Sequence, residues 1–313
     1  MREQAPWPEA IGAALCEPGA NRSLLFDRGF RGFERDGNAL KVPPQEKAAF
    51  LRDIAAFQGD LSAFLARRKQ SLESLGAQPL HLVSATPLVV GLGLPSPLET
   101  GFLFDRLTGC PYLAGSSVRG LARATARLVA KGELEGDRAY WTEALERSFG
   151  PFGDGEAGRR KGRLVFYDAF PCSWPRLSVD VLTPHYGPYY RDPSRPPADW
   201  EDPVPVQFLH VAPGTAFTFW VGAVGAQLEE TEQQQVLELL RLGLDWLGIG
   251  GKRSQGYGAF GSQAPPPPAA PPTAPRSQPK PPKPASKPES RGNLSAKNLA
   301  ELSKFLPGGG GEP

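Results

Sequence analysis

The chain has 313 residues, of which 40% are hydrophobic and 22% are charged, a composition typical of a globular protein. Its formal net charge of +2 is unevenly distributed: residues 263–313 carry seven Lys/Arg and three Asp/Glu, which leaves the rest of the chain at −2. A slightly acidic body cannot attract nucleic acid through its overall charge, so any RNA site must come from local clusters.

Hydropathy and the distribution of cysteines and histidines exclude several function classes. No apolar run approaches the roughly 20 residues that span a bilayer, and the N-terminal residues lack the apolar core of a signal peptide. Cys16, Cys110 and Cys172 are too scattered for a disulfide framework or a paired zinc motif. The three histidines are equally dispersed. We therefore expect a cytoplasmic protein without a metal or cofactor.

The first strong pattern lies at residues 45–75, where apolar side chains recur every three or four positions and predict helix. Gly59 interrupts the pattern, so two shorter helices are an alternative. We assign residues 1–78 to a helical N-terminal extension. The apolar positions belong to the core or to an interface with another chain: Phe50, Leu51, Ile54, Phe57, Leu61, Phe64 and Leu65.

Residues 79–262 alternate between strand and helix patterns. Strands are predicted at 80–90, 163–170 and 257–260, and a hairpin is predicted from 204–211 and 215–224 with its turn at Pro213-Gly214. The apolar period predicts helices at 116–130 and 230–247. Antiparallel strands with two interspersed helices indicate an α+β, ferredoxin-like (RRM-like) core with insertions.

Residues 263–313 form a proline-rich tail whose composition favours solvated polyproline II and disorder. Within it, residues 295–306 place Leu299, Leu302 and Leu306 at helical spacing. The segment is either a tethered docking peptide or a frayed tail with incidental leucines, because isolated helices this short are marginal in water.

A glycine-rich loop at residues 248–258 is the most informative segment. Five glycines in eleven residues allow positive φ angles and close approach to a ligand, and successive amides can form an anion-binding nest. Lys252 and Arg253 add positive charge, and Tyr257 offers a ring for stacking on a base. The alternative is a flexible turn with solvated charges. The residues predicted to bind RNA are Gly250, Gly251, Lys252, Arg253, Ser254, Gln255 and Tyr257.

Two nucleotide-binding motifs are only superficially present in this loop. Residues 256–261 match G-x-G-x-x-G, but the proline-rich tail follows where a Rossmann fold needs a helix. Arg253 stands where a P-loop has Ser or Thr, so nucleotide hydrolysis is not predicted.

A second cationic element begins at residue 115. A serine N-cap would leave amides free for a phosphate, and Arg119, Arg123 and Arg127 recur every four residues along one helical face. No acidic residue lies between 116 and 132, although an ordinary solvated face remains the alternative. The predicted RNA-binding residues here are Ser116, Ser117, Arg119, Arg123 and Arg127. A third basic cluster, at residues 159–163, is either an RNA-contacting loop or a solubilising one.

The segment from Gly91-Leu92-Gly93 through Glu99 and the segment 109–120 resemble the signature of the RAMP superfamily of type III CRISPR systems, and the glycine-rich loop is its second hallmark. Segments 21–25, 180–190, 205–209 and 214–217 are similar to the family of sixth subunits of type III-B Cmr effector complexes. The resemblance extends over residues 20–261 and departs at the tail. Ala114 replaces the proline usual before Gly-Ser-Ser, which loosens the expected turn.

The resemblance implies a RAMP ferredoxin-like core in an antiviral ribonucleoprotein, located at the head near the 3′ part of the guide crRNA. The implied partners are the guide crRNA, target RNA, the backbone RAMP subunit, the small helical subunit and the other head-end RAMP subunit. Target cleavage belongs to the backbone subunit, so no catalytic residue is carried over. His185 falls in a segment that resembles the family's structural or RNA-contacting loop.

Two other functions stay open at this point. A metal-independent endoribonuclease would need a general base and acid, for which His81, His185 and Tyr186 are the available side chains. A structural adaptor would use its charges to meet acidic neighbours and would bind no RNA by itself.

Overall fold

The structure, a computed structural model, describes residues 21–261 except 38, 152–160, 185, 187–188, 191, 193, 195, 197–202 and 226. Contacts divide the chain into two units, residues 1–267 and 268–313, and every described residue belongs to the first. The proline-rich tail at 263–313, with its predicted helix at 295–306, lies outside the described residues.

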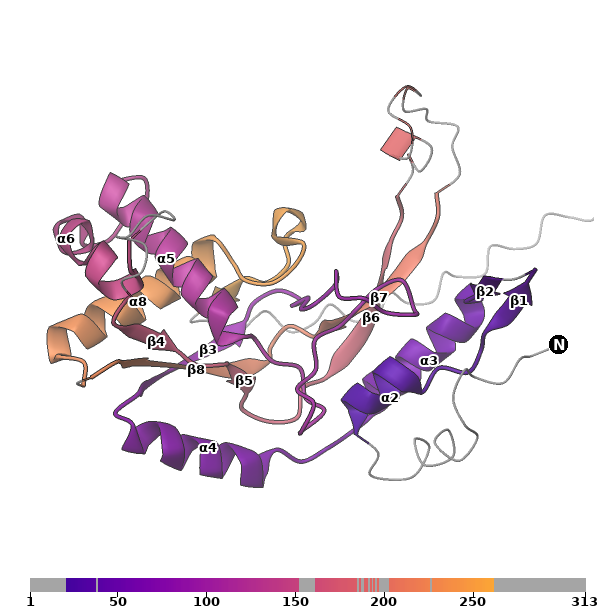
Figure 1. Ribbon diagram of the computed structural model, residues 1–313, viewed down its shortest axis with the longest axis horizontal. Coiled ribbons are helices and arrows are strands. Elements are labelled where there is room, and N and C mark those ends of the chain that lie inside the picture. The colour runs from indigo at the N-terminus through magenta and orange to yellow at the C-terminus, as the bar shows by residue number, and fades with distance from the viewer. Residues whose placement is uncertain are drawn as a thin grey trace, which may run out of the picture. The chain divides into compact units, whose positions relative to one another are not determined.

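A five-stranded antiparallel sheet forms the centre of the fold (Figure 1). Its strands are β3 (Gln78–Ser84), β4 (Leu164–Phe166), β5 (Phe170–Pro171), β8 (Ala216–Ala223) and β9 (Phe260–Gly261). The order is β4-β8-β3-β9, and β5 pairs with β8. Helix α5 (Gly115–Lys131) follows β3, and α8 (Glu230–Trp246) connects β8 to β9. This βαββαβ order confirms the predicted α+β, ferredoxin-like class.

Helices α5 and α8 cover one face of this sheet and pack their apolar sides into the core (Figure 1). Because side chains alternate along a strand, Leu80 and Leu82 of β3 and Phe217 and Phe219 of β8 all face the helices and are buried. Gly115 allows α5 to begin close to β4, since a Cβ there would lie 2.3 Å from the Phe166 carbonyl oxygen. The buried helical positions are Gly115, Val118, Leu121, Ala122, Thr125, Ala126 and Val129 on α5, and Glu232, Val236, Leu239, Leu240, Gly243 and Leu244 on α8.

The N-terminal pattern forms two helices, α3 (Pro44–Ala56) and α4 (Ser62–Ser74), as the alternative with a break near Gly59 predicted. Helix α4 lies on the sheet face opposite α5 and α8 (Figure 1). The sequence did not predict α2 (Arg22–Arg28) or the small β1 (Glu34–Asp36) and β2 (Ala39–Lys41) pair. The boundary proposed between residues 78 and 79 stays a prediction, and β3 begins at that point.

Two insertions extend the core. Helix α6 (Arg138–Phe149) follows α5, and a two-stranded ribbon of β6 (Leu177–Leu182) and β7 (Val206–Val211) separates β5 from β8. The predicted hairpin between 204–211 and 215–224 is wrong, because β7 pairs with β6 while β8 pairs with β3. The Pro213-Gly214 turn carries the chain between the two sheets, and the Gly214 amide donates to the Ser84 carbonyl over 2.8 Å.

Three predicted strands are shorter than expected. The 80–90 strand ends at Ser84, beyond which Leu88 and Val89 make only isolated bridges. The 163–170 strand is divided into β4 and β5. The 257–260 strand shifts to β9 because Gly258 has a φ of +80°, which ends the extended conformation on its N-terminal side. In the part of the chain that the structure describes, no helix combines the length and apolarity that crossing a membrane requires.

Candidate nucleic-acid interface

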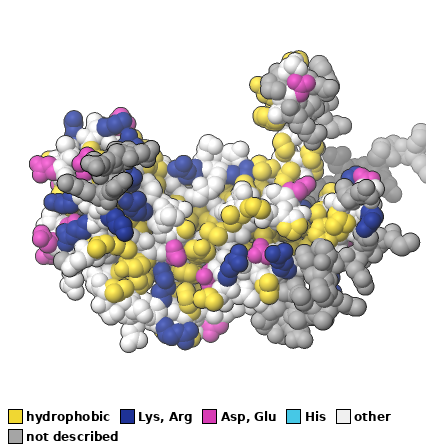
Figure 2. Space-filling view, in the orientation of Figure 1, with side chains coloured by type: hydrophobic (Ala, Val, Ile, Leu, Met, Phe, Trp, Pro, Cys, Tyr) yellow, Lys and Arg dark blue, Asp and Glu magenta, His cyan; other side chains and the backbone are white. Residues whose placement is uncertain are grey.

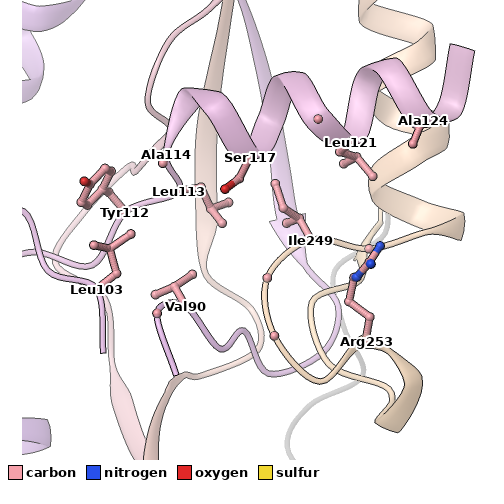
Figure 3. Close-up of a pocket in the computed structure, with 15 residues that line it drawn as sticks. Val90, Leu103, Tyr112, Leu113, Ala114, Ser117, Leu121, Ala124, Ile249 and Arg253 are labelled. Carbon is pink, nitrogen blue, oxygen red and sulfur yellow. The ribbon is translucent and has the colours of Figure 1, made fainter. Parts of the chain in front are cut away.

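A pocket of about 430 Å³ lies between the start of α5 and the glycine-rich loop (Figure 3). The two cationic elements predicted from sequence, which are far apart along the chain, therefore line one cavity. Helix α5 contributes Ser117, Gly120, Leu121 and Ala124, the loop contributes Gly248, Ile249, Gly250, Gly251 and Arg253, and the remaining lining residues are Val90, Gly91, Leu103, Tyr112, Leu113 and Ala114.

The glycine-rich loop is fixed to the segment that follows β3. The Gly251 amide donates to the Val89 carbonyl over 2.8 Å, and the Gly258 amide donates to the Pro87 carbonyl over 2.8 Å. Gly250 has a φ of +94°, and a Cβ there would lie 2.4 Å from the Val89 carbonyl oxygen. Glycine is needed at this position both for the dihedral and for the close approach of the two segments.

Part of the loop's backbone remains available to an anion. Residues Arg253–Gln255 form one 3₁₀ turn after Lys252, which adopts the left-handed conformation with φ +59°. Within the described chain, the amides of Gly250, Lys252, Arg253 and Ser254 donate to no protein acceptor. Arg253 is exposed, and its side chain extends from the loop toward α5 (Figure 3). Unpaired amides beside a guanidinium suit a phosphate oxygen.

The start of α5 differs from the predicted serine cap. Ala114 is the N-cap, and the Gly115 amide donates over 2.7 Å to the carboxylate of Asp168 in the loop between β4 and β5. The negative charge that stabilises the N-terminus of α5 is thus supplied by a residue of the protein itself. Ser117 instead lines the pocket, whereas Ser116 is exposed on the same turn but is not among the lining residues.

The arginine stripe on α5 faces α6 rather than the pocket. Arg119 donates to the Phe149 carbonyl at the end of α6, and Arg123 donates to the Pro151 carbonyl over 3.1 Å. Burial lowers the pKa of Arg123, as do the charges of Arg119 and Arg127, so the three guanidinium groups lie close together. Figure 2 shows Lys and Arg side chains gathered over α5 and α6. The stripe is a cationic surface beside the pocket and also a cap for α6.

Tyr257 points away from the pocket, toward the β6–β7 ribbon. Its hydroxyl donates to the Asp180 carboxylate, and its ring centroid lies 6.1 Å from that of Phe208. Lys252 lies on the same side, with its ammonium 5.2 Å from the Phe208 ring and donating to the side chain of Gln255 over 2.9 Å. These contacts fix the loop to the ribbon, so the partly buried ring that was predicted to stack on a base packs against the ribbon instead.

The charge on Asp180 controls this attachment. Burial alone would raise the pKa of Asp180, but hydrogen bonds from the Tyr257 hydroxyl and the Val181 amide, together with the nearby His210 and Lys252, lower it overall. Burial and the bond to Asp180 raise the pKa of Tyr257 to about 12. At neutral pH, therefore, a protonated phenol donates to an ionised carboxylate.

Replacing Asp180 with asparagine is expected to loosen the glycine-rich loop. The prediction is faster amide hydrogen exchange at residues 248–258 at pH 7, with little change in the helices, because only the loop loses an attachment. Since the pKa of Asp180 is lowered in the folded state, its contribution is complete above the ordinary value near 3.8 and is lost as the pH falls through the lower folded value. Asp53→Asn on the exposed face of α3 is the control; equal protection in the Asp180 variant and this control would contradict the role.

The histidines available for catalysis are not at the pocket. His81 lies on the α4 side of the sheet, where its Nδ1 is 3.0 Å from the Thr218 hydroxyl, and His185 lies outside the described residues. Among the described residues that line the pocket there is no His, Asp, Glu, Lys or Cys. The described segments also contain no cluster of three or more His, Cys, Asp or Glu that could hold a metal ion.

The basic cluster at 159–163 is described only at Lys161, Gly162 and Arg163. Arg163 forms an ion pair with the buried Glu232 over 2.7 Å and donates to the Gln227 carbonyl over 2.9 Å. This arginine therefore joins β4 to the start of α8 and is part of the fold.

The structure brings four predicted residues to the pocket: Ser117, Gly250, Gly251 and Arg253. It places Lys252, Ser254, Gln255 and Tyr257 on the loop outside the lining, and Ser116, Arg119, Arg123 and Arg127 elsewhere on α5. Sequence reasoning missed Tyr112, Gly120, Asp168 and Asp180. Tyr112 and Gly120 lie within the 109–120 segment that carried the resemblance, which was the available signal; Asp168 offered none, because its role depends on the β4–β5 loop.

Comparisons with known proteins identify the family. The family model of the RAMP superfamily matches residues 81–261. A relative from Pyrococcus furiosus, CRISPR system Cmr subunit Cmr6, is 31% identical over 236 residues, which cover 60% of this chain and 68% of the relative.

Among solved structures, the cryo-EM structure of the type III-B Cmr-beta complex bound to cognate target RNA contains a chain of similar fold. That chain has a TM-score of 0.50 and 23% identity, over 68% of this chain and 71% of that one. The crystal structure of Cmr6 from Pyrococcus furiosus aligns with a TM-score of 0.34 and 28% identity, over 59% and 97%. The family model and the sequence relative together show that this chain belongs to the RAMP superfamily and, within it, to the Cmr6 family.

Proposed function

We propose that this RAMP subunit of CRISPR defence is a non-catalytic RNA-binding component of a type III-B Cmr complex, and that it holds the guide RNA. The observation that carries the proposal is the shared pocket, whose lining includes Gly250 and Arg253 of the loop, each with an unpaired amide, together with Ser117 of α5. The loop supplies the cation and the amides, and α5 adds the Ser117 hydroxyl on the other side of the same cavity.

Family membership supports the assembly and its partners. The relative at 31% identity is a Cmr subunit, and the Cmr-beta complex that contains a chain of similar fold is bound to target RNA. We therefore place this chain beside the backbone RAMP subunit, the small helical subunit and the other head-end RAMP subunit. Its position at the head, near the 3′ part of the crRNA, follows from the sequence resemblance.

The arrangement suits a phosphodiester backbone for an electrostatic reason. The body of the protein has no net positive charge, so attraction must be local, and the pocket combines Arg253 with neutral amides that lose little by desolvation. The Arg119–Arg127 stripe adds positive charge on the neighbouring face of α5. A strand that follows α5 would meet both in turn.

The chemistry of the lining supports binding without cleavage. Cleavage of RNA without a metal needs a general base and a general acid around the phosphate. The described lining residues supply an arginine, a tyrosine and a serine but no imidazole or carboxylate. The two carboxylates discussed above are already engaged, since Asp168 accepts from the Gly115 amide and Asp180 accepts from the Tyr257 hydroxyl.

Incubation of the full-length chain with end-labelled single-stranded guide RNA tests the proposal. The expected result at low salt is retention of the RNA on a filter with no new fragments, with or without a chelator. Metal-independent fragments that disappear in His185→Ala would identify a nuclease instead. Failure to retain RNA at any salt concentration would favour the structural adaptor.

A further inference from the structure

The pocket has two chemically different ends. In Figure 3, Tyr112, Leu103 and Val90 close one end, while Arg253 lies at the other, facing α5. The Tyr112 ring is held in place by stacking on Phe170, with the centroids 5.5 Å apart and the planes 13° from parallel. One end is thus a rigid aromatic and aliphatic wall, and the other offers a cation and backbone amides.

Gly120 of α5 also lines the pocket, and no packing contact with the described residues of the protein requires glycine at this position. It is exposed in the interior of α5, and a Cβ at this position would meet no protein atom within 4 Å. By contrast, a Cβ at Gly115 or Gly243 would lie 2.3 Å from a neighbouring atom, so packing requires glycine at those positions. Glycine weakens a helix relative to alanine, so its presence at 120 points to something outside the chain that approaches the backbone there.

We infer that the pocket holds one unstacked nucleotide of the guide strand. Its base would lie against Tyr112 and Leu103, its ribose beside Gly120, and its phosphate on Arg253 and the loop amides. The volume of about 430 Å³ falls in the range of small-ligand pockets, and single-stranded RNA is commonly recognised with bases turned out of the stack. The inference rests on the proposed function and adds which part of the RNA the pocket takes.

The lining also predicts that the pocket accepts a base by its shape and does not distinguish which of the four bases it is. At the base end, the described side chains are aliphatic apart from the hydroxyls of Tyr112 and Ser117, and a hydroxyl can both donate and accept. Such groups do not distinguish one Watson–Crick edge from another. The site should accept any of the four bases but should lose affinity when no base is present.

An abasic scan of a bound oligonucleotide tests this directly. The full-length chain is titrated with single-stranded RNAs of one sequence, each carrying one abasic nucleotide at a successive position. We expect one position to weaken binding about 10-fold, as base stacking on a protein wall usually does, and other positions to change it less than about 2-fold. Replacing the base at the sensitive position with any other should also change affinity less than about 2-fold.

A protein variant whose added side chain fills the pocket tests the same inference from the protein side. Gly120→Leu is expected to weaken binding of the intact RNA about 10-fold and to remove the extra effect of the abasic position. Gly120→Ala guards against a folding artefact, because alanine should raise the melting temperature by roughly 2–3 °C while still weakening binding. Gln70→Leu, exposed on α4 at the other face of the sheet, is the control for an added apolar side chain.

The outcomes separate the two levels of the account. Two results would overturn the inference of a nucleotide pocket and leave the proposed function intact. One is normal RNA affinity that does not depend on the position of the abasic nucleotide, and the other is a Gly120→Leu variant that binds RNA like the native chain. No affinity for any oligonucleotide would overturn both. Micromolar binding of free nucleoside monophosphates, abolished by Gly120→Leu, would show that the pocket takes a free nucleotide and would overturn the inference that it holds a nucleotide of the guide strand.

Discussion

Replacing Lys252 and Arg253 together with alanine is expected to weaken binding of single-stranded guide RNA about 30- to 100-fold near 0.1 M salt. A charge-assisted hydrogen bond from Arg253 to a phosphate contributes about 1.5–3 kcal/mol, and Lys252 adds a second positive charge close by, so losing both should cost roughly 2–3 kcal/mol. Arg253 lines the pocket, and Lys252 precedes it on the same turn. The free energy of unfolding should fall by less than about 1 kcal/mol, because the loop's backbone attachments at Gly251 and Gly258 remain.

The salt dependence distinguishes this loss from a general loss of charge. Removing two positive charges beside the strand should make the log-log slope of affinity against salt shallower by up to about 1.4, from about 0.7 per neutralised phosphate on a single strand. The control is Arg67→Ala with Lys69→Ala on α4, which removes the same charge from the opposite face of the sheet. Equal loss of affinity in both double variants would show that RNA binding is not localised at the loop.

Gly258→Ala is expected to lower the free energy of unfolding by about 3 kcal/mol and to impair RNA binding as well. Gly258 has a φ of +80°, which costs an L-residue about 1–2 kcal/mol. A Cβ there would also lie only 1.9 Å from the Ile249 carbonyl oxygen, which is backbone and cannot move aside without displacing the loop. The strain and the clash act together, and urea denaturation measures their sum.

Gly256→Ala separates the two causes. Gly256 has a similar φ of +87°, but a Cβ there meets nothing within 4 Å, so only the dihedral strain of about 1–2 kcal/mol applies. The expected result is a clearly smaller loss of stability and near-native RNA affinity. Similar stability losses for Gly256→Ala and Gly258→Ala would contradict the close packing of Gly258 against the Ile249 carbonyl within the loop.

The parts of the fold that depend on local periodicity were predictable. Helices α5 and α8 match the predicted ranges within one residue at each end, because each has a strong apolar stripe that buries against the sheet. The break at Gly59 correctly divided the N-terminal pattern into two helices. The ferredoxin-like order follows from the sequence of these elements.

Strand pairing was harder to predict from the sequence, because each strand pairs with partners that are far away along the chain. Pro213-Gly214 has the composition of a hairpin turn, yet it moves the chain from the β6–β7 ribbon to the central sheet. Turn chemistry specifies a change of direction and does not specify which strand will be the neighbour. The β6 strand carries an irregular burial pattern and was not recognised.

The candidate site shows the same division. The glycine-rich loop and Ser117 were found from composition and spacing, whereas the acceptor at the start of α5 is Asp168, a residue that only the fold brings there. Helical spacing correctly placed Arg119, Arg123 and Arg127 on one face of α5. Spacing alone could not show that this face meets the carbonyl end of α6.

The central claim is that the guide RNA passes through the pocket shared by α5 and the glycine-rich loop. The most direct measurement is a map of zero-length ultraviolet crosslinks between protein and crRNA in the assembled particle. The account predicts crosslinked peptides that cover residues 112–124 and 248–257, with both joined to neighbouring nucleotides of the guide. Crosslinks confined to other surfaces of the chain, with these two peptides unmodified, would contradict it.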